Sequence, residues 1–187
     1  SEIIMLNNII TEDKLILRLQ EISKNGILDA EDADRSENMH RLFMYPAMMV
    51  PAAQSAIIQA FSDILPPNTY AIDPFMGSGT SLLSCIEFGF NVFGQDINPF
   101  AVLLSKAKTT TYDILKLRIT LDNIKDHIAQ DNSTTIDISF SSIDKWFSTE
   151  AQISFSKIRR AINAEEDINY RYFFWVLMSE AIRVGKI

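Results

Sequence analysis

The sequence has a single cysteine, Cys85, and only two histidines among its 187 residues. One cysteine excludes a disulfide within the chain and a metal site built on cysteines. His40 and His127 lie far apart, and neither has a cysteine or an acidic cluster beside it. We therefore predict no metal site, and an intracellular, reducing compartment, hence a cytoplasmic location, fits best.

Long apolar runs are also missing. No run approaches the ~20 residues of a membrane span, and the N-terminus lacks the basic, then apolar, then small-residue order of a signal peptide. We expect no membrane partner. With 47% hydrophobic and 22% charged residues, the composition is that of an ordinary globular protein.

Positive charge is scarce, because 17 Lys and Arg stand against 24 Asp and Glu, for a net charge of −7 and a pI of about 4.8. A protein that binds nucleic acid through phosphates presents a basic face. These residues alone are therefore expected to bind DNA poorly, and a DNA substrate requires basic elements on a missing segment or on a partner.

The centre of the chain alternates between strand and helix patterns. We predict strands at 70–72 and 91–95, a helix at 80–88 after the first, and a helix from Pro99 to about 108 after the second. Asn98 is placed as an N-cap before Pro99. Two strands joined through one helix imply a right-handed parallel crossover, and hence an α/β layered fold.

The flanking segments have helical periodicity. Apolar spacing predicts helices at 12–24, from Pro51 to about 64, at 114–128, and in two segments from 145 to the end. Ile136, Ile138 and Phe140 alternate with polar residues, which predicts a third short strand. Arg159 and Arg160 with Lys157 form a small basic patch, interpreted as a solvated face or as a phosphate contact.

The sequence Gly77-Ser78-Gly79 stands between a predicted strand and a predicted helix. Glycines there allow close approach of a ligand, at the carboxyl edge where α/β sheets bind ligands. The free N–H groups of the helix favour a carboxylate. Asp73 can accept from an ammonium, and Asp96, 17 positions after Gly79, from the hydroxyls of a ribose. An apolar surface for adenine can come from Ile97, Pro99 and Phe100.

Two alternative ligands fit poorly. A dinucleotide fingerprint requires a third glycine, where this chain has Leu82, and a P-loop requires a lysine, where Thr80 and Ser81 follow the glycines. Without a lysine, and with anionic Asp73 beside the turn, phosphate is a poor guest. A ligand with an ammonium and a ribose is a better one, and S-adenosylmethionine meets that description.

These residues resemble a known family. Asp73 to Thr80 is similar to motif I of the amino-directed DNA methyltransferases, which methylate adenine N6 or cytosine N4. Gln95 to Ala101 resembles the family's second motif, whose acid holds the ribose, and Tyr45 to Pro51 resembles its motif X, usually written with His-Pro. The resemblance implies cofactor-binding roles for Ala47, Met48, Asp73, Pro74, Phe75, Gly77, Ser78, Gly79, Thr80, Asp96, Ile97 and Pro99.

One motif of that family is absent. Its members carry Asp/Asn/Ser-Pro-Pro-Tyr/Phe at the end of the fourth strand, which binds the target amino group and stacks on the flipped base. The chain has no such tetrapeptide, since Leu65-Pro66-Pro67-Asn68 lacks both the polar first residue and the aromatic last one. The catalytic residues are therefore unknown. We expect a truncated methyltransferase that is inactive by itself.

The resemblance implies an incomplete Rossmann-like fold, a parallel sheet with flanking helices and helical segments at both ends. We expect an N-terminal helical segment with an acidic loop at 1–39, the S-adenosylmethionine-binding domain at 40–145 and a C-terminal helical segment at 146–187. The implied function is DNA methylation at an amino group, adenine N6 preferred, as in restriction-modification. An RNA amino-methyltransferase and a non-catalytic cofactor-binding or assembly subunit stay open as alternatives.

Overall fold

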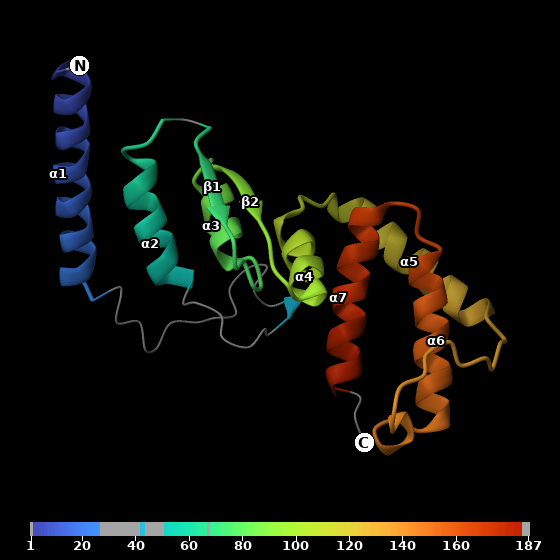
Figure 1. Ribbon diagram of the computed structural model, residues 1–187. Coiled ribbons are helices and arrows are strands. Elements are labelled where there is room, and N and C mark those ends of the chain that lie inside the picture. The colour runs from blue at the N-terminus through green and yellow to red at the C-terminus, as the bar shows by residue number, and fades with distance from the viewer. Residues whose placement is uncertain (1, 27–41, 44–50, 67, 185–187) are drawn as a thin grey trace. The chain divides into compact units, whose positions relative to one another are not determined.

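A computed structural model describes residues 2–26, 42–43, 51–66 and 68–184 (Figure 1). The chain forms two compact units, Ser1–Thr109 and Thr110–Ile187, called unit 1 and unit 2 below. The segments 1–39, 40–145 and 146–187 that the sequence predicts follow motifs rather than packing, and they stay predictions.

Unit 1 is an α/β unit. Its elements are α1 (Glu2–Lys24), α2 (Pro51–Ser62), β1 (Tyr70–Asp73), α3 (Thr80–Glu87), β2 (Asn91–Gly94) and α4 (Pro99–Thr109). The strands pair in parallel, with Ile72 opposite Phe93. The predicted strand–helix–strand crossover is confirmed. The further prediction of a Rossmann-like sheet is not tested by these two strands.

Local signals explain most of these boundaries. The side chain of Asn98 accepts a hydrogen bond from the N–H of Phe100 at 3.0 Å, so α4 begins with the predicted cap and with Pro99 as its first residue. Helix α1 begins at Glu2, ten residues before the predicted start at 12. No glycine or proline interrupts 2–24, so nothing in the sequence stops the helix in that direction.

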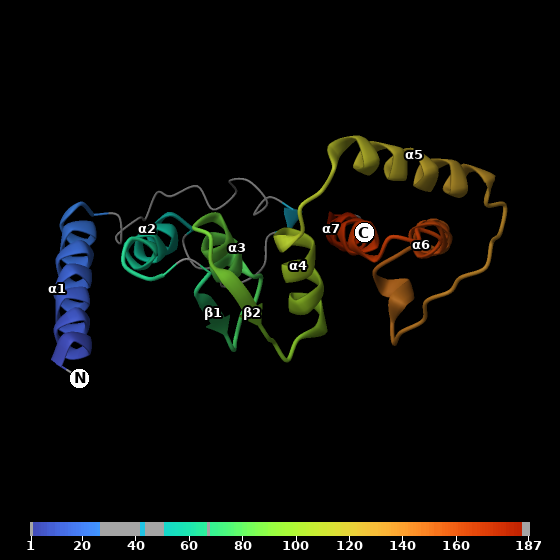
Figure 2. The ribbon, with the colours of Figure 1, turned by 90° about the horizontal axis from the view of Figure 1, so that it is seen from above.

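The two faces of the sheet differ. Helix α3 packs against both strands, α2 and α4 flank α3, and α1 packs against α2. A Cβ added to Gly94 would lie 2.6 Å from a methyl of Leu82 on α3, so this face is tightly covered. From above, α3 lies on one side of the strands (Figure 2). The other side bears Tyr70, Ile72 and Phe93, all exposed.

Unit 2 is helical. It consists of α5 (Ile114–Gln130), a 3-10 turn (Ile143–Lys145), α6 (Thr149–Asn163) and α7 (Ile168–Val184), which confirms the predicted helices there. Asp113 and Ser148 cap α5 and α6 by accepting from the backbone N–H groups of Lys116 and Ala151. Its core of buried residues is Ile124, Ala161, Ile162, Phe174 and Met178.

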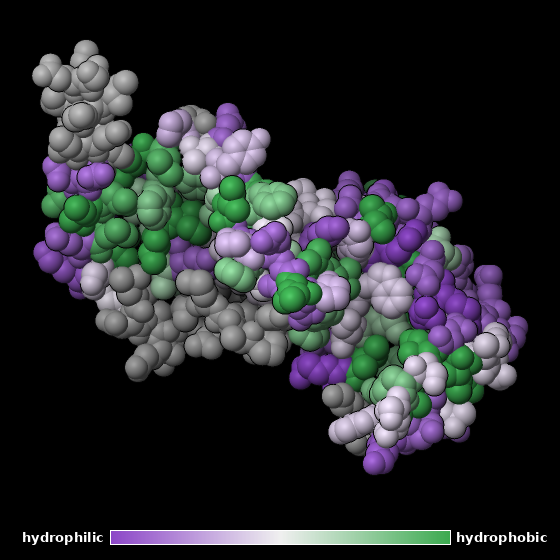
Figure 3. Space-filling model, in the orientation of Figure 1, coloured by the Kyte–Doolittle hydropathy of each residue, from purple (hydrophilic) through white to green (hydrophobic). Residues whose placement is uncertain are grey.

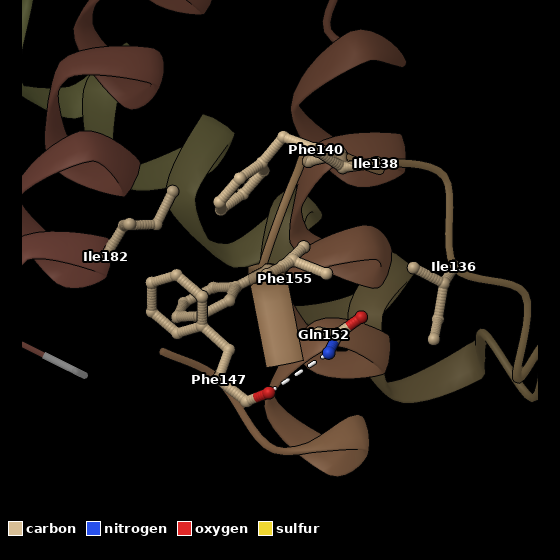
Figure 4. A pocket seen from close by; sticks show the side chains of 8 residues that line it. Ile136, Ile138, Phe140, Phe147, Gln152, Phe155 and Ile182 are labelled. Atoms are coloured by element: carbon tan, nitrogen blue, oxygen red, sulfur yellow. Dashed lines mark hydrogen bonds between the residues drawn. The ribbon is translucent and has the colours of Figure 1, made fainter. Parts of the chain in front are cut away.

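The strand predicted at Ile136 to Phe140 is wrong. The segment forms neither helix nor strand, and side chains of α6 bind its backbone. Asp137 donates its N–H to Ser156 Oγ at 3.0 Å, and Arg159 donates to the Asp137 carbonyl at 2.9 Å. The alternating apolar residues line a small pocket of about 70 Å³ with Phe147, Phe155 and Ile182 (Figure 4). The alternation does not mark a buried side of the segment, because Ile136 and Phe140 are 39% and 49% exposed.

No helix among the residues described is both long enough and apolar enough to cross a membrane.

Candidate functional site

The parallel crossover brings the ends of β1 and β2 to one edge of the sheet. Asp73 ends β1 opposite Gly94, which ends β2. The chain leaves β1 into the glycine loop, 74–79, and leaves β2 into the segment that carries Asp96. Both predicted acids therefore lie at the carboxyl edge, where open α/β sheets bind ligands.

The glycine loop is held by backbone hydrogen bonds. Met76 donates its N–H to the carbonyl of Gln95 at 3.0 Å, and Gly79 donates to the carbonyl of Met76 at 2.8 Å. Gly77 and Gly79 have φ of 50° and 74°, in the left-handed region that favours glycine. Gly79 immediately precedes the first residue of α3, so this turn sets where the helix begins.

Helix α4 closes the loop from behind. Ser105 donates its hydroxyl to the carbonyl of Gly77 at 3.1 Å. A Cβ added to Gly79 would lie 2.6 Å from Ser105 Oγ and 2.9 Å from its Cβ. Position 79 therefore requires glycine for two reasons: its φ is in the left-handed region, and a side chain there would clash with Ser105 of α4. The sequence analysis did not single out Ser105, because a serine within a helix carries no sequence signal for a contact 28 residues away.

Asp96 binds the loop directly. Its carboxylate accepts from the N–H of Gly77 at 2.9 Å through Oδ2 and from the N–H of Asn98 at 2.8 Å through Oδ1. Each carboxylate oxygen can accept more than one hydrogen bond, so both retain capacity for a further donor. The predicted ribose acid is thus also the group that couples the β2 end to the glycine loop.

Asp73, the last residue of β1, binds both the glycine loop and α3. Its carboxylate accepts from the N–H of Phe75 at 3.0 Å and from the hydroxyl of Ser81 in α3. Burial, with a smaller contribution from this nearby carboxylate, raises the pKa of the Cys85 thiol. The negative charge of Asp73 therefore sits at the start of α3, where the helix N–H groups stabilise an anion.

The remaining predicted site residues divide into buried and exposed ones. Ser78 and Thr80 are buried, and their hydroxyls lie 3.1 Å apart in a hydrogen bond to each other, so they offer a ligand their backbone rather than their side chains. Phe75 is 86% exposed and Ile97 is fully exposed, and Pro74 and Pro99 are exposed too. Ala47 and Met48, with the rest of the predicted motif X before Pro51, lie outside the described residues.

Both arginines of the basic patch on α6 are bound within unit 2. Arg160 pairs with Asp131 at 2.7 Å and with Asp137 at 2.6 Å. Arg159 donates to a backbone carbonyl. These contacts engage the arginines internally, which disfavours the phosphate-contact interpretation of the patch. Within the described ranges, no group of three or more His, Cys, Asp or Glu is placed to hold a metal ion.

No model of a known protein family matches the chain, and no solved structure matches it significantly. Curated proteins similar to it include the Type II methyltransferase M.MvaI of Kocuria varians, 34% identical over 179 residues, with 91% of this chain and 39% of that protein covered. Another is the Type II methyltransferase M.MjaII of Methanocaldococcus jannaschii, 36% identical over 87 residues, with 46% of this chain and 16% of that protein covered.

The chain therefore spans about two fifths of the length of M.MvaI and less of M.MjaII. Over most of its own length, it is similar to a part of a Type II methyltransferase.

Proposed function

We propose that this chain is the S-adenosylmethionine-binding part of a DNA methyltransferase that methylates an exocyclic amino group, with adenine N6 preferred over cytosine N4. Similarity to Type II methyltransferases supports the methyltransferase class. The motifs at 73–80 and 95–101 support the cofactor and the amino-directed type. The enzyme contacts its DNA substrate through segments beyond these residues or through a partner.

The observation that carries the proposal is the hydrogen bond from Gly77 to Asp96. This bond joins the glycine loop after β1 to the acid after β2, at the carboxyl edge of the sheet. An edge with two carboxylates, Asp73 and Asp96, suits a ligand with an ammonium and two hydroxyls better than one with phosphates. These two acceptor groups therefore fit S-adenosylmethionine.

Each group has an assigned role. Asp73 accepts from the ammonium, and the first N–H groups of α3 receive the carboxylate. Asp96 accepts from the ribose hydroxyls, while Ile97, with Pro99 and Phe100, supplies apolar surface to the adenine. Ser78 and Thr80 contribute backbone, and Pro74 and Pro99 fix the direction of the chain as it leaves each strand. The family resemblance assigns Ala47 and Met48 to the methionine end.

S-adenosylmethionine, when bound, supplies an electrophilic methyl group to the amino nitrogen of a flipped base in a direct transfer. The residues of this chain hold and orient that donor. Orientation of the base belongs to the Pro-Pro-aromatic motif, which the sequence lacks. We therefore expect this chain to bind the donor and to be inactive in methyl transfer by itself.

Calorimetric titration with S-adenosylmethionine tests the proposal. We expect saturable binding, weakened by about 1–3 kcal/mol in Asp96→Asn, which removes the charge and one acceptor. Asp122→Asn is the matched control, because Asp122 is an exposed acid on α5 whose partner is Lys125, one turn away. Unchanged affinity in Asp96→Asn would contradict the assigned site. Absence of binding to the unmodified chain would contradict the proposal itself.

A non-catalytic cofactor-binding or assembly subunit is the second candidate. The net charge of −7 favours it, because a protein that binds DNA through its phosphates presents a basic face. Methyl transfer to DNA and to RNA, assayed with the chain joined to the complementary part of M.MvaI, distinguishes the three possibilities. Transfer to DNA supports the first proposal, transfer to RNA supports an RNA methyltransferase, and binding without transfer supports the subunit.

A further inference from the structure

Two phenylalanine rings meet beside the candidate site in unit 1. Phe43 packs edge-to-face against Phe100, with the ring centroids 4.9 Å apart and the ring planes at 71°. Phe100 lies in the first turn of α4, four residues after Asp96, whereas Phe43 comes from a much earlier part of the chain. The described residues 42–43 lie beside α4 in both ribbon views (Figures 1 and 2). The contact therefore adds an aromatic ring from a distant part of the sequence to the segment that follows β2.

This ring pair differs from the other apolar side chains at the surface of unit 1. Hydrophobic side chains are exposed over the strands as well (Figure 3), and exposure alone does not identify a binding site. Phe43 and Phe100 are both half-buried, and each ring limits the position of the other. The two rings, called the aromatic corner below, stand nearly at a right angle. A planar base can stack on one of them while it meets the other edge-to-face, and both arrangements are favourable.

The aromatic corner lies where the proposed cofactor places its base. Asp96, assigned to the ribose hydroxyls, is fixed by the N–H groups of Gly77 and Asn98. Adenine is bonded to that ribose, so it lies within reach of the residues that follow Asp96. Among these, Ile97 is fully exposed and offers an aliphatic surface. A base between Ile97 and solvent keeps one face in water, whereas an aromatic ring provides the surface on which bases stack.

We propose that Phe43 is a further adenine-binding residue of the S-adenosylmethionine site and acts together with Phe100 as the aromatic corner on which the base stacks. The inference rests on the proposed function and adds to it a residue outside the motifs that carry the family resemblance. Phe43 stands two positions before Tyr45, where the predicted motif X begins. This part of the sequence then serves both ends of the cofactor, because the resemblance assigns Ala47 and Met48 to the methionine.

Calorimetric titration of this chain with S-adenosylmethionine tests the inference with three variants. Phe43→Leu keeps an apolar side chain but removes the ring, and the affinity should fall about fivefold or more, the lower end of the loss of one base–aromatic stack. Phe43→Tyr keeps the ring and should retain the affinity within about twofold. The matched control is Phe61→Leu, because Phe61 is a partly exposed phenylalanine of α2 without a role in the site, and its affinity should be unchanged.

A second probe identifies the part of the cofactor that Phe43 contacts. 5′-Methylthioadenosine has the same base and ribose but no amino acid. Phe43→Leu should therefore weaken its binding by the same factor as that of S-adenosylmethionine. A loss confined to S-adenosylmethionine would overturn the inference, because it would place Phe43 at the methionine end. Unchanged affinity in Phe43→Leu, or an equal loss in Phe61→Leu, would overturn it too.

Two further results separate this inference from a structural effect and from the proposed function. Slow labelling of the buried Cys85 shows that each variant is folded when it is titrated, and recovery of affinity in Phe43→Tyr shows that the ring itself is needed. Binding that Asp96→Asn weakens and Phe43→Leu does not would overturn this inference alone. Absence of binding to the unmodified chain would overturn both proposals.

Discussion

The two units bury their apolar side chains in different ways. Unit 2 packs α5, α6 and α7 around a core of its own, in which Phe174 and Ile162 are almost fully buried. Unit 1 packs its helices on one face of a two-stranded sheet and leaves Ile72 and Phe93 exposed on the other. Among the described residues, unit 2 thus encloses an apolar core, whereas unit 1 leaves large apolar side chains of its sheet at the surface.

Each unit contains a natural reporter of its own unfolding. Both tryptophans, Trp146 and Trp175, lie in unit 2, and the only cysteine, Cys85, is buried in unit 1. Burial raises the pKa of the Cys85 thiol, which lowers the thiolate fraction and slows its labelling further. Tryptophan fluorescence and thiol labelling therefore follow the two units separately.

The largest expected loss of stability is at Phe174, in the core of unit 2. Phe174→Ala removes a ring from the core of unit 2 and should cost about 3–5 kcal/mol in the free energy of unfolding, measured by urea titration with tryptophan fluorescence. Phe93→Ala removes a ring of the same size from the exposed side of β2 and should change the stability of unit 1 by less than about 0.5 kcal/mol, measured by Cys85 labelling. A similar loss in both variants would mean that Phe93 is covered in solution.

The next effect is expected at the glycine loop. Gly79→Ala forces a side chain into the left-handed region and against Ser105, which should destabilise unit 1 by about 2–4 kcal/mol. Gly89→Ala is the matched control, because Gly89 has a similar φ of 80° but no atom within 4 Å of an added Cβ, so about 1 kcal/mol is expected there. Cys85 labelling in urea measures both.

A second variant identifies the steric part of that loss. In a Ser105→Gly background, Gly79→Ala should cost less than in the unmodified chain, because the contacts with Ser105 Oγ and Cβ are gone. Additive losses would show that the left-handed φ alone accounts for the effect and that α4 does not close the loop.

The sequence predicts the strand–helix–strand crossover well, because its signals are local. Gly77 and Gly79 mark the turn, and Asn98 with Pro99 marks the start of α4 within two adjacent residues. The sequence also predicts correctly that Asp96 lies at the carboxyl edge of the sheet. It cannot predict that Asp96 binds Gly77, 19 residues away, or that Ser105 binds Gly77 across 28 residues, because those contacts depend on how the elements pack.

The wrong strand at 136–140 has the same cause. Alternation of apolar residues is the signal of a half-buried strand, but here Ile136 and Phe140 stay exposed while they line a pocket between side chains of unit 2. Here Ser156 and Arg159 of α6 bind the backbone groups that a neighbouring strand would bind. Binding by side chains from a helix 19 or more residues away leaves no periodic signal in the sequence.

The smallest expected effect concerns how unit 2 holds this segment, and it depends on pH. The Arg160 hydrogen bond, followed by the N–H of Ser133, lowers the pKa of Asp131 in the folded chain. A lowered pKa means that the carboxylate stabilises the fold above its unfolded pKa of about 3.9, and that this contribution is lost as the pH falls through the folded value. Arg160→Met removes the main cause.

The stability difference between the unmodified chain and Arg160→Met should therefore be largest near neutral pH and narrow once the pH falls below about 4. Arg159→Met is the control, because Arg159 donates to a backbone carbonyl, which does not titrate, and its stability difference should not change with pH. Urea midpoints from tryptophan fluorescence between neutral and acidic pH measure both variants. A difference for Arg160→Met that stays constant down to pH about 3 would show that Asp131 and Arg160 are not paired in solution. The segment 131–137 would then lack this ion-pair attachment to α6. Unit 2 would be less tightly packed than its contacts indicate, and the contrast with unit 1 would be smaller.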